Sequence, residues 1–394
     1  MPKLNRSQLS DLRGMARMAI DATDTITEVV EKLHRTIQLR PGPLGVSATD
    51  RPSGITGLVY RCVRGSIRLA GRAVDASLSG VTLLLPDGES SPALDAYRSA
   101  ANGVYGDYLL RTGNPLAIDM SLLHHGRPVD IQDPSSIIEQ HSDASPGNKL
   151  LVFVHGLCMN DRQWNRNGHD HGAALADEQG YLPLYLRYNS GLHIATNGRL
   201  LAEMLETLIG NWAAPLDEVV IMGHSMGGLV ARSACHHASR AGHGWPNYLR
   251  KLVFLGTPHH GAPLERGGHG LDLVMDLSPY SVPFTRLSKA RSAGITDLRH
   301  GTISEGKDIV PLPSGVQCYA AAAMRAAKRS RLSERLIGDG LVTLDSALGR
   351  HRDRARTLPI PTNRQWVGYG MGHRDLLSHP EAYRQISTWL QEPG

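Results

Sequence analysis

Six short apolar runs, separated by helix-compatible stretches, set the pattern of the second part of the chain. They occupy 150–154, 182–186, 219–222, 252–255, 316–320 and 365–369. Runs of this length are typical of parallel strands buried on both faces, and the stretches between them can form crossover helices. The sequence therefore predicts an α/β protein with a mainly parallel sheet and flanking helices from Lys149 onward.

The first 148 residues have a different pattern and predict a mainly helical N-terminal extension. Apolar residues recur at three-to-four spacing over 7–37 and over 54–78, and a small-residue-rich stretch covers 91–125. The polar segment 133–148 separates this region from the strands. We expect a domain boundary there, with 1–148 as the extension and 149–394 as the catalytic domain.

The helical stretch 54–78 carries a basic stripe beside its apolar one, formed by Arg61, Arg64, Arg68 and Arg72. Such a pattern is typical of a helix that lies on a membrane surface or on a protein partner. It is also the pattern of a helix that packs on its own protein and turns the arginines to water, which is the commoner case. Peripheral membrane contact through residues 7–80 is thus one of two interpretations.

Composition excludes several classes of protein. The 394 residues have a formal net charge of +5 and only 5% aromatic side chains, and no basic block alternates with aromatics, which disfavours nucleic-acid binding. The four cysteines form no Cys-x-x-Cys pair, no secretory signal is visible and no apolar stretch is long enough to span a bilayer. We expect a cytoplasmic protein without a cofactor; its oligomeric state stays open.

A serine stands where one strand gives way to a helix. Gly223-His224-Ser225-Met226-Gly227-Gly228 follows the apolar run 219–222 and precedes helix-compatible sequence. Glycines on both sides of a serine relieve the crowding of a sharp turn and let Oγ project from the sheet edge. The spacing predicts a nucleophile at Ser225, and the alternative is a helix cap.

A serine nucleophile needs a base and a carboxylate that orients it, and both have candidates after Ser225. His373 follows the last apolar run, whereas its competitor His379 is predicted to begin the closing helix. Asp339, between two glycines, is the predicted carboxylate. Asp345 is a weaker substitute, and Asp308 belongs to the wrong connection.

Acyl transfer also needs N–H donors for the oxyanion. Position predicts the backbone N–H of Met226, directly after the serine, and that of Leu157, after the first core strand. His155 is expected to brace this loop through hydrogen bonds, and His224 to support the site. Cys158 could serve as a nucleophile, although no separate base is evident for it.

At this point the chain resembles bacterial lipases and esterases of the α/β-hydrolase fold. The likeness covers about residues 149 to 392 and rests on five motifs that occur in the order of that family: Val154–Leu157, Gly223–Gly228, Gly256–Gly261, Gly338–Val342 and Gly372–Leu377. The resemblance implies hydrolysis of carboxylic esters, lipid esters included, through an acyl-enzyme on Ser225. The chain is also similar to lipase-like enzymes that deacylate membrane substrates.

The insertion 262–306 is apolar and punctuated by prolines, which indicates a candidate lid or acyl-binding wall, or else a pair of packing helices. Nineteen histidines raise the question of a metal, and His169-Asp170-His171 has the best reach, but no ligand set is assigned.

Two further functions stay open at the level of sequence. A thioesterase, an amidase or an acyltransferase needs the same groups as an esterase. A non-catalytic scaffold that binds a membrane or a partner through residues 1–80 is the alternative of another class.

Overall fold

A computed structural model describes residues 5–38, 55–82, 91–141, 149–262, 292–306, 309–326 and 338–393. Its contacts divide the chain into two compact units. One unit comprises Met1–Leu94 and Leu109–Ala117, and the other comprises Asp95–Tyr108 and Ile118–Gly394. The unit that contains the sheet thus begins earlier in the chain than the predicted boundary at residue 149.

Eight strands form one sheet in the part of the chain that the structure describes, in the order β2-β1-β4-β3-β5-β6-β7-β8. Their bounds are β1 Ser121–His124, β2 Arg127–Pro128, β3 Lys149–Val154, β4 Leu182–Arg187, β5 Glu218–His224, β6 Leu249–Leu255, β7 Gln317–Met324 and β8 Gln365–Tyr369. β1 pairs antiparallel with β2 and β4, and every pairing from β4 to β8 is parallel. The predicted α/β-hydrolase fold with a mainly parallel sheet is confirmed.

Strand β1 corrects the prediction that 91–125 is helical throughout. The helix α3 spans Pro92–Arg111, and the chain then enters the sheet at Ser121. The turn after β1 has positive φ angles at His125 (48°) and Gly126 (77°), which closes the hairpin to β2. Pairing of Leu122 with Leu186 of β4 decides the strand, and a four-residue segment carries too little pattern to show it.

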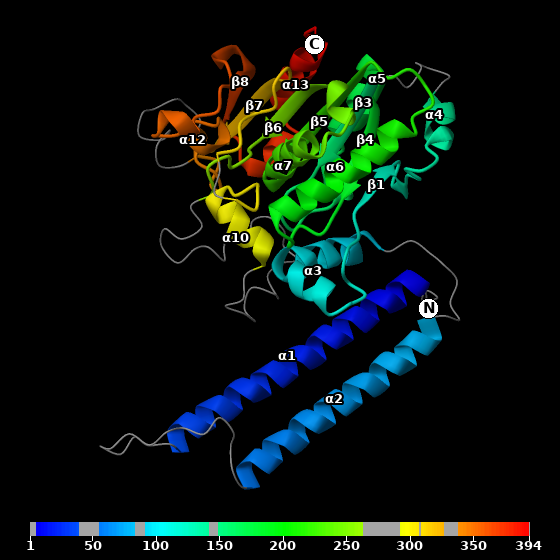
Figure 1. Ribbon diagram of the computed structural model, residues 1–394, viewed down its shortest axis with the longest axis vertical. Coiled ribbons are helices and arrows are strands. Elements are labelled where there is room, and N and C mark those ends of the chain that lie inside the picture. The colour runs from blue at the N-terminus through cyan, green and yellow to red at the C-terminus, as the bar shows by residue number, and fades with distance from the viewer. Residues whose placement is uncertain are drawn as a thin grey trace. The chain divides into compact units, whose positions relative to one another are not determined.

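Side chains alternate between the two faces of the sheet, and each face has its own helices. Leu151 and Phe153 of β3 join a buried cluster with Trp389 of α13 (Pro380–Gln391) and Leu175 of α5 (His171–Gln179). On the other face, α7 (Met226–Ala241) contacts β3, β5 and β6, and α6 (Ile194–Gly210) packs on α7. In Figure 1, α6 and α7 lie in front of the strands. The remaining helices of this unit are α4 Ser135–His141, α10 Ala293–His300 and α12 Leu344–Ala347.

The other unit contains the two helices predicted over residues 7–37 and 54–78, and they form a hairpin. Its helices are α1 (Arg6–Gln38) and α2 (Ile55–Thr82). Arg13 binds Asp75 at 2.6 Å, and Arg64 binds Asp24 at 2.9 Å. Because an early residue of α1 meets a late residue of α2 and the reverse also holds, the two helices are antiparallel.

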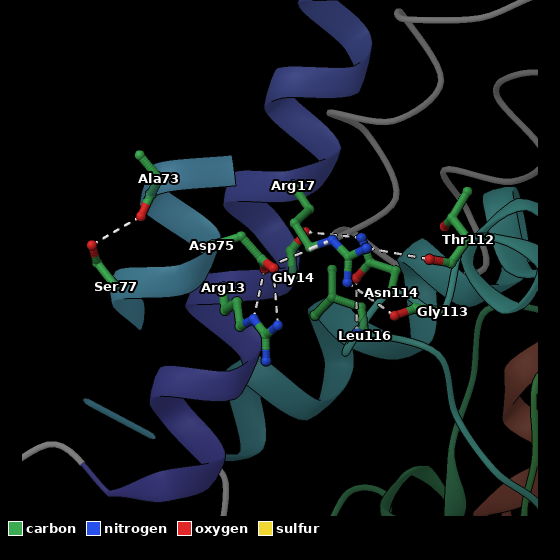
Figure 2. A network of polar contacts seen from close by, with 10 residues as sticks. All are labelled: Arg13, Gly14, Arg17, Ala73, Asp75, Ser77, Thr112, Gly113, Asn114 and Leu116. Carbon is green, nitrogen blue, oxygen red and sulfur yellow. Dashed lines mark hydrogen bonds and ion pairs between the residues drawn. The ribbon is translucent and has the colours of Figure 1, made fainter. Parts of the chain in front are cut away.

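The segment after α3 also belongs to the hairpin unit and binds α1 through main-chain groups. The Arg17 guanidinium donates to the carbonyls of Gly113 and Thr112, and the Asn114 side chain donates to that of Gly14, as Figure 2 shows. A Cβ at Gly14 would lie 2.5 Å from Leu116, so only glycine permits this approach. No helix in the described ranges combines the length and the apolarity needed to span a bilayer.

Candidate active site

Ser225 occupies a sharp corner between β5 and α7. Its φ of 53° and ψ of −122° are unusual for a residue with a side chain, and strain of this kind is typical of a nucleophile at a strand-to-helix turn. A Cβ at Gly223 would lie 2.4 Å from the nitrogen of Gly228, and one at Gly227 would lie 2.0 Å from the carbonyl oxygen of Val154. The glycines of the motif are therefore required by the close approach of the backbone.

His373 and Asp339 form a buried hydrogen bond. Nδ1 of His373 lies 2.6 Å from Oδ2 of Asp339, and the side chains are 3% and 1% exposed. The other carboxylate oxygen of Asp339 accepts the backbone N–H groups of Leu341 and Val342, both at 2.8 Å. The carboxylate is thus held on one side by main chain and leaves one oxygen for the imidazole. This arrangement places the Nδ1 proton of His373 toward Asp339 and leaves Nε2 as the basic nitrogen.

The turn that presents Asp339 depends on its flanking glycines and on a residue that the sequence prediction did not include. Gly338 and Gly340 have φ angles of 49° and 95°, a region that favours glycine. Arg325, directly after β7, donates from Nε to the carbonyl oxygen of Asp339 at 3.1 Å. The same guanidinium lies against Gly340, where a Cβ would be 2.8 Å from Cζ. Arg325 therefore fixes the turn, a role for which the sequence holds no signal.

The imidazole of His373 and Ser225 lie at the same edge of the sheet. A Cβ at Gly256 would be 2.9 Å from Cε1 of His373, so the ring rests on the residue that follows β6. The preceding residue, Leu255, accepts the backbone N–H of Ser225 at 2.8 Å. Nε2 of His373 is buried and has no hydrogen-bond partner among the described residues, and no hydrogen bond joins it to Ser225.

The loop after β3 passes next to the nucleophile. A Cβ at Gly156 would lie 3.1 Å from that of Ser225. The carbonyl of Gly156 accepts hydrogen bonds from Nδ1–H of His155 at 2.8 Å and from the N–H of Met159 at 3.3 Å. Because a peptide group is planar, fixing this carbonyl also fixes the direction of the Leu157 N–H. The contact agrees with the bracing role expected for His155.

His155 stays neutral because it is enclosed. Burial lowers its pKa to about 4, and its ring stacks on Tyr188, whose hydroxyl donates to the carbonyl of His155 at 2.7 Å. A neutral imidazole donates through one nitrogen only, and here that nitrogen serves Gly156. His155 is therefore a structural support of the loop.

His224, next to the nucleophile, also contacts the catalytic candidates. Its Nε2 lies 3.3 Å from the carbonyl oxygen of His373, and the two ring centroids are 4.7 Å apart. Burial, reinforced by the neighbouring His373, holds the pKa of His224 well below its usual value. A neutral His224 donates its Nε2 proton to that carbonyl and helps to place the turn on which His373 lies.

Cys158 does not have the chemistry of a nucleophile. Burial raises the pKa of its thiol to about 12, so the thiolate is scarce at neutral pH. Its φ of 59° and the hydrogen bond from its backbone N–H to Oγ of Ser190 instead show a residue at a tight point of the loop. The nucleophile hypothesis for Cys158 is therefore less favourable than that for Ser225.

The middle of α3 packs on this same loop, which the sequence prediction assigned to a separate extension. The side chain of Asn160 donates to Oγ of Ser99 at 3.1 Å, and a Cβ at Gly103 would lie 2.2 Å from Sγ of Cys158. Oγ of Ser292, which caps α10, donates to the carbonyl of Gly103 at 2.7 Å. The small residues over 99–103 are the signal that could have indicated this close packing.

The other candidates from the sequence have structural roles or lie outside the described residues. The side chain of His379 caps α13 by accepting the N–H of Glu381, as expected for the start of that helix. Asp345 lies in the first turn of α12. Asp308 and residues 263–291, most of the predicted lid, are outside the described ranges.

The histidines do not gather into a metal site within the described ranges, where no group of three suitable side chains occurs. His169 and His171, the pair with the best reach in the sequence, are hydrogen-bonded to each other at 2.8 Å. Nε2 of His171 also binds the carbonyl of Leu376 at 2.9 Å. Both nitrogens of His171 are thus engaged, and Nε2 holds the turn after His373.

Comparison with known proteins places a family domain on the part of the chain that forms the sheet. Residues 146–321 match the model of a family described as "PGAP1-like alpha/beta domain". The match includes the nucleophile corner and the loop after β3, and it ends within β7. No curated protein matches the sequence significantly.

Several solved structures are similar in fold. A lipase of Bacillus licheniformis has a TM-score of 0.44 and 19% identity over 69% of this chain and 98% of its own. A naproxen esterase of Bacillus subtilis has a TM-score of 0.37 and 13% identity over 62% of this chain and 84% of its own. An esterase of Pyrococcus furiosus has a TM-score of 0.38 and 15% identity over 62% and 82%, respectively.

Proposed function

We propose that this protein is a serine hydrolase that cleaves carboxylic esters through an acyl-enzyme on Ser225. The observation that carries the proposal is the buried 2.6 Å hydrogen bond between His373 and Asp339, at the edge of the sheet where Ser225 stands in a strained corner. A base oriented by a carboxylate next to a presented hydroxyl is the arrangement that makes serine nucleophilic.

In the first half of the reaction, Oγ of Ser225 attacks the ester carbonyl while Nε2 of His373 takes the hydroxyl proton. Asp339 stabilises the resulting imidazolium through the Nδ1 proton without becoming protonated itself. The oxyanion accepts the N–H groups of Leu157 and Met226, of which the first is oriented by the hydrogen bonds on Gly156. Collapse of the tetrahedral intermediate expels the alcohol, which takes the proton from His373.

In the second half, water attacks the acyl-enzyme by the same route. His373 takes a proton from the water, the oxyanion forms again in the same pair of N–H groups, and the acid leaves as Ser225 recovers its proton. Lipid esters fit this chemistry as well as small esters do, since the reacting group is the same.

The experiment that tests the proposal compares two buried serines of one region. Ser225→Ala removes the nucleophile and should lower turnover of p-nitrophenyl esters by several orders of magnitude, roughly 10⁶-fold. Ser233→Ala, whose hydroxyl only donates to the carbonyl of Ile303, should retain most of the activity. A fluorophosphonate should label the wild type and Ser233→Ala but not Ser225→Ala. Undiminished turnover by the Ser225 variant would refute the proposal.

A further inference from the structure

Helix α2 uses one side to pair with α1. Gly71 is buried on this side, where a Cβ would lie 2.7 Å from Ile20. Arg64 pairs with Asp24 at 2.9 Å and Asp75 with Arg13 at 2.6 Å on the same side. Arg68 also pairs with Asp24, at 2.9 Å, so this side accounts for the only aspartate of α2 and for two of its four arginines.

The opposite side of α2 presents an apolar surface, which we call the outer face. Val59, Val63, Leu69 and Val74 are 53%, 43%, 70% and 43% exposed, respectively. By helical periodicity, the other exposed residues on this side of α2 are small and uncharged: Cys62, Gly65, Ser66, Ala70, Ala73, Ala76 and Ser77. The exposed Arg68 and Arg72 lie outside this side of the helix. At 1.5 Å per residue, the stretch from Val59 to Ser77 covers about 28 Å of helix. A continuous surface of this length without a charged side chain is a binding surface rather than a scatter of single exposed residues.

Arg72 borders the outer face, and no carboxylate of α2 does. The exposed Arg72 lies beside this face, whereas Arg68 pairs with Asp24 of α1 at 2.9 Å and Asp75 pairs with Arg13. A second copy of this helix, placed by two-fold symmetry on the same face, would add a second Arg72 and no acidic side chain of α2 to neutralise either one. An anionic lipid surface accepts the apolar residues among its acyl chains and neutralises Arg72 with its headgroups.

We propose that the outer face of α2 docks on an anionic membrane surface, with Val59, Val63, Leu69 and Val74 inserted at the interface and Arg72 at the level of the headgroups. The hydrogen-bonded pairs with α1 keep α2 in the hairpin while its other side meets the lipid. Docking of this kind would bring a hydrolase to lipid esters, but it does not depend on the chemistry of Ser225.

The test is flotation of the full chain with vesicles of phosphatidylcholine, with and without phosphatidylglycerol. The wild type should float with the anionic vesicles and much less with the neutral ones. Val63→Glu combined with Leu69→Glu should lower the bound fraction at least roughly tenfold, because carboxylates replace inserted side chains and face anionic headgroups. Arg72→Glu should weaken binding to anionic vesicles by roughly tenfold and leave the weak binding to neutral ones unchanged.

The matched control is Ile309→Glu, which places a carboxylate on an exposed apolar residue of the sheet unit, 53% exposed, and should bind as the wild type does. Thermal unfolding of each variant reports on folding without any ester. Equal flotation with both vesicle types, wild-type flotation of the double variant, or loss of flotation in the control would overturn the proposal. So would a wild-type dimer that Val63→Glu/Leu69→Glu dissociates without lipid, since the occupant would then be a second copy.

Discussion

The hairpin of α1 and α2 and the sheet unit both rely on pairs of charged or polar side chains, in surroundings that differ. In the hairpin, Arg13 and Asp75 are about a quarter exposed, and water competes for both groups. In the sheet unit, His373 and Asp339 are nearly inaccessible and have main-chain donors behind the carboxylate. Both pairs have a separation of 2.6 Å. The Arg13–Asp75 pair fixes the register of α1 against α2, whereas the His373–Asp339 pair fixes which nitrogen of the imidazole carries the proton.

The comparison extends to the pKa values. Arg13 lowers the pKa of Asp75 by a hydrogen bond, and Arg64 does the same for Asp24. Around the candidate site, burial is the first cause of the shifts of His155 and His171, whose pKa values it lowers to about 4. Desolvation, rather than pairing, therefore sets the protonation of the groups around the site.

The largest loss of ester turnover that this contrast predicts follows from a substitution at Asp339. Asp339→Asn keeps the shape of the side chain but removes the charge that orients His373, so ester turnover should fall by roughly 10⁴-fold. Asp345→Asn, a carboxylate in the neighbouring helix α12, is the matched control and should keep near wild-type turnover. Steady-state kinetics on a soluble ester decide the matter. Similar losses of turnover in the two variants would mean that Asp339 does not specifically orient His373.

A second prediction concerns the stability of the sheet unit at acidic pH. The folded pKa of His171 lies below that of the unfolded chain, so the unfolded chain takes up the proton first, and stability falls as the pH decreases from about 6.5 to about 4. His171→Gln retains a donor for the carbonyl of Leu376 but does not titrate. The variant should lose roughly 3 kcal/mol less stability over this interval than the wild type does.

Urea unfolding near neutral pH and near pH 4 measures that difference. An unaltered acid loss in His171→Gln would show that burial of this ring is not what makes the sheet unit sensitive to acid.

A third prediction tests whether α3 belongs to the catalytic unit. Gly103→Ala should be favourable for a helix, yet its Cβ would push on Cys158 and move the loop that carries Leu157. We expect kcat for a soluble ester to fall by roughly 10²-fold with KM little changed. Gly210→Ala, at the end of α6 with nothing within 4 Å of the added carbon, should be neutral.

Partial recovery of kcat on adding Cys158→Ala to Gly103→Ala would tie the loss to this contact, because the nearest clash is with Sγ. If kcat is unchanged in Gly103→Ala, or if KM alone rises, α3 does not position the loop.

The smallest effect is expected in the hairpin. Asp75→Asn weakens a partly exposed ion pair, which should lower the local stability of α1 and α2 by less than about 1 kcal/mol and leave ester turnover unchanged. Hydrogen exchange of the α1 and α2 amides measures it, and salt should diminish the difference from the wild type. A loss of several kcal/mol would mean that this pair behaves like a buried one.

The sequence by itself determined the parallel strands, the strained serine corner, and the order of serine, aspartate and histidine. Local sequence patterns predict these features. The patterns are apolar runs of strand length, and glycines where the backbone must turn sharply or approach another chain segment. The sequence also predicted the two N-terminal helices, because the apolar residues recur at helical spacing over stretches long enough to specify a helix, 7–37 and 54–78.

Only the tertiary structure decided that Ser121–His124 is a strand, that Arg325 holds the turn of Asp339, and that the middle of α3 belongs with the sheet. It also decided that Arg64 and Arg68 of the basic stripe pair with Asp24 within the hairpin. Each of these depends on contacts between residues far apart in the chain. A short segment or a single side chain carries no periodicity, so its role is fixed by the partner that the fold brings to it.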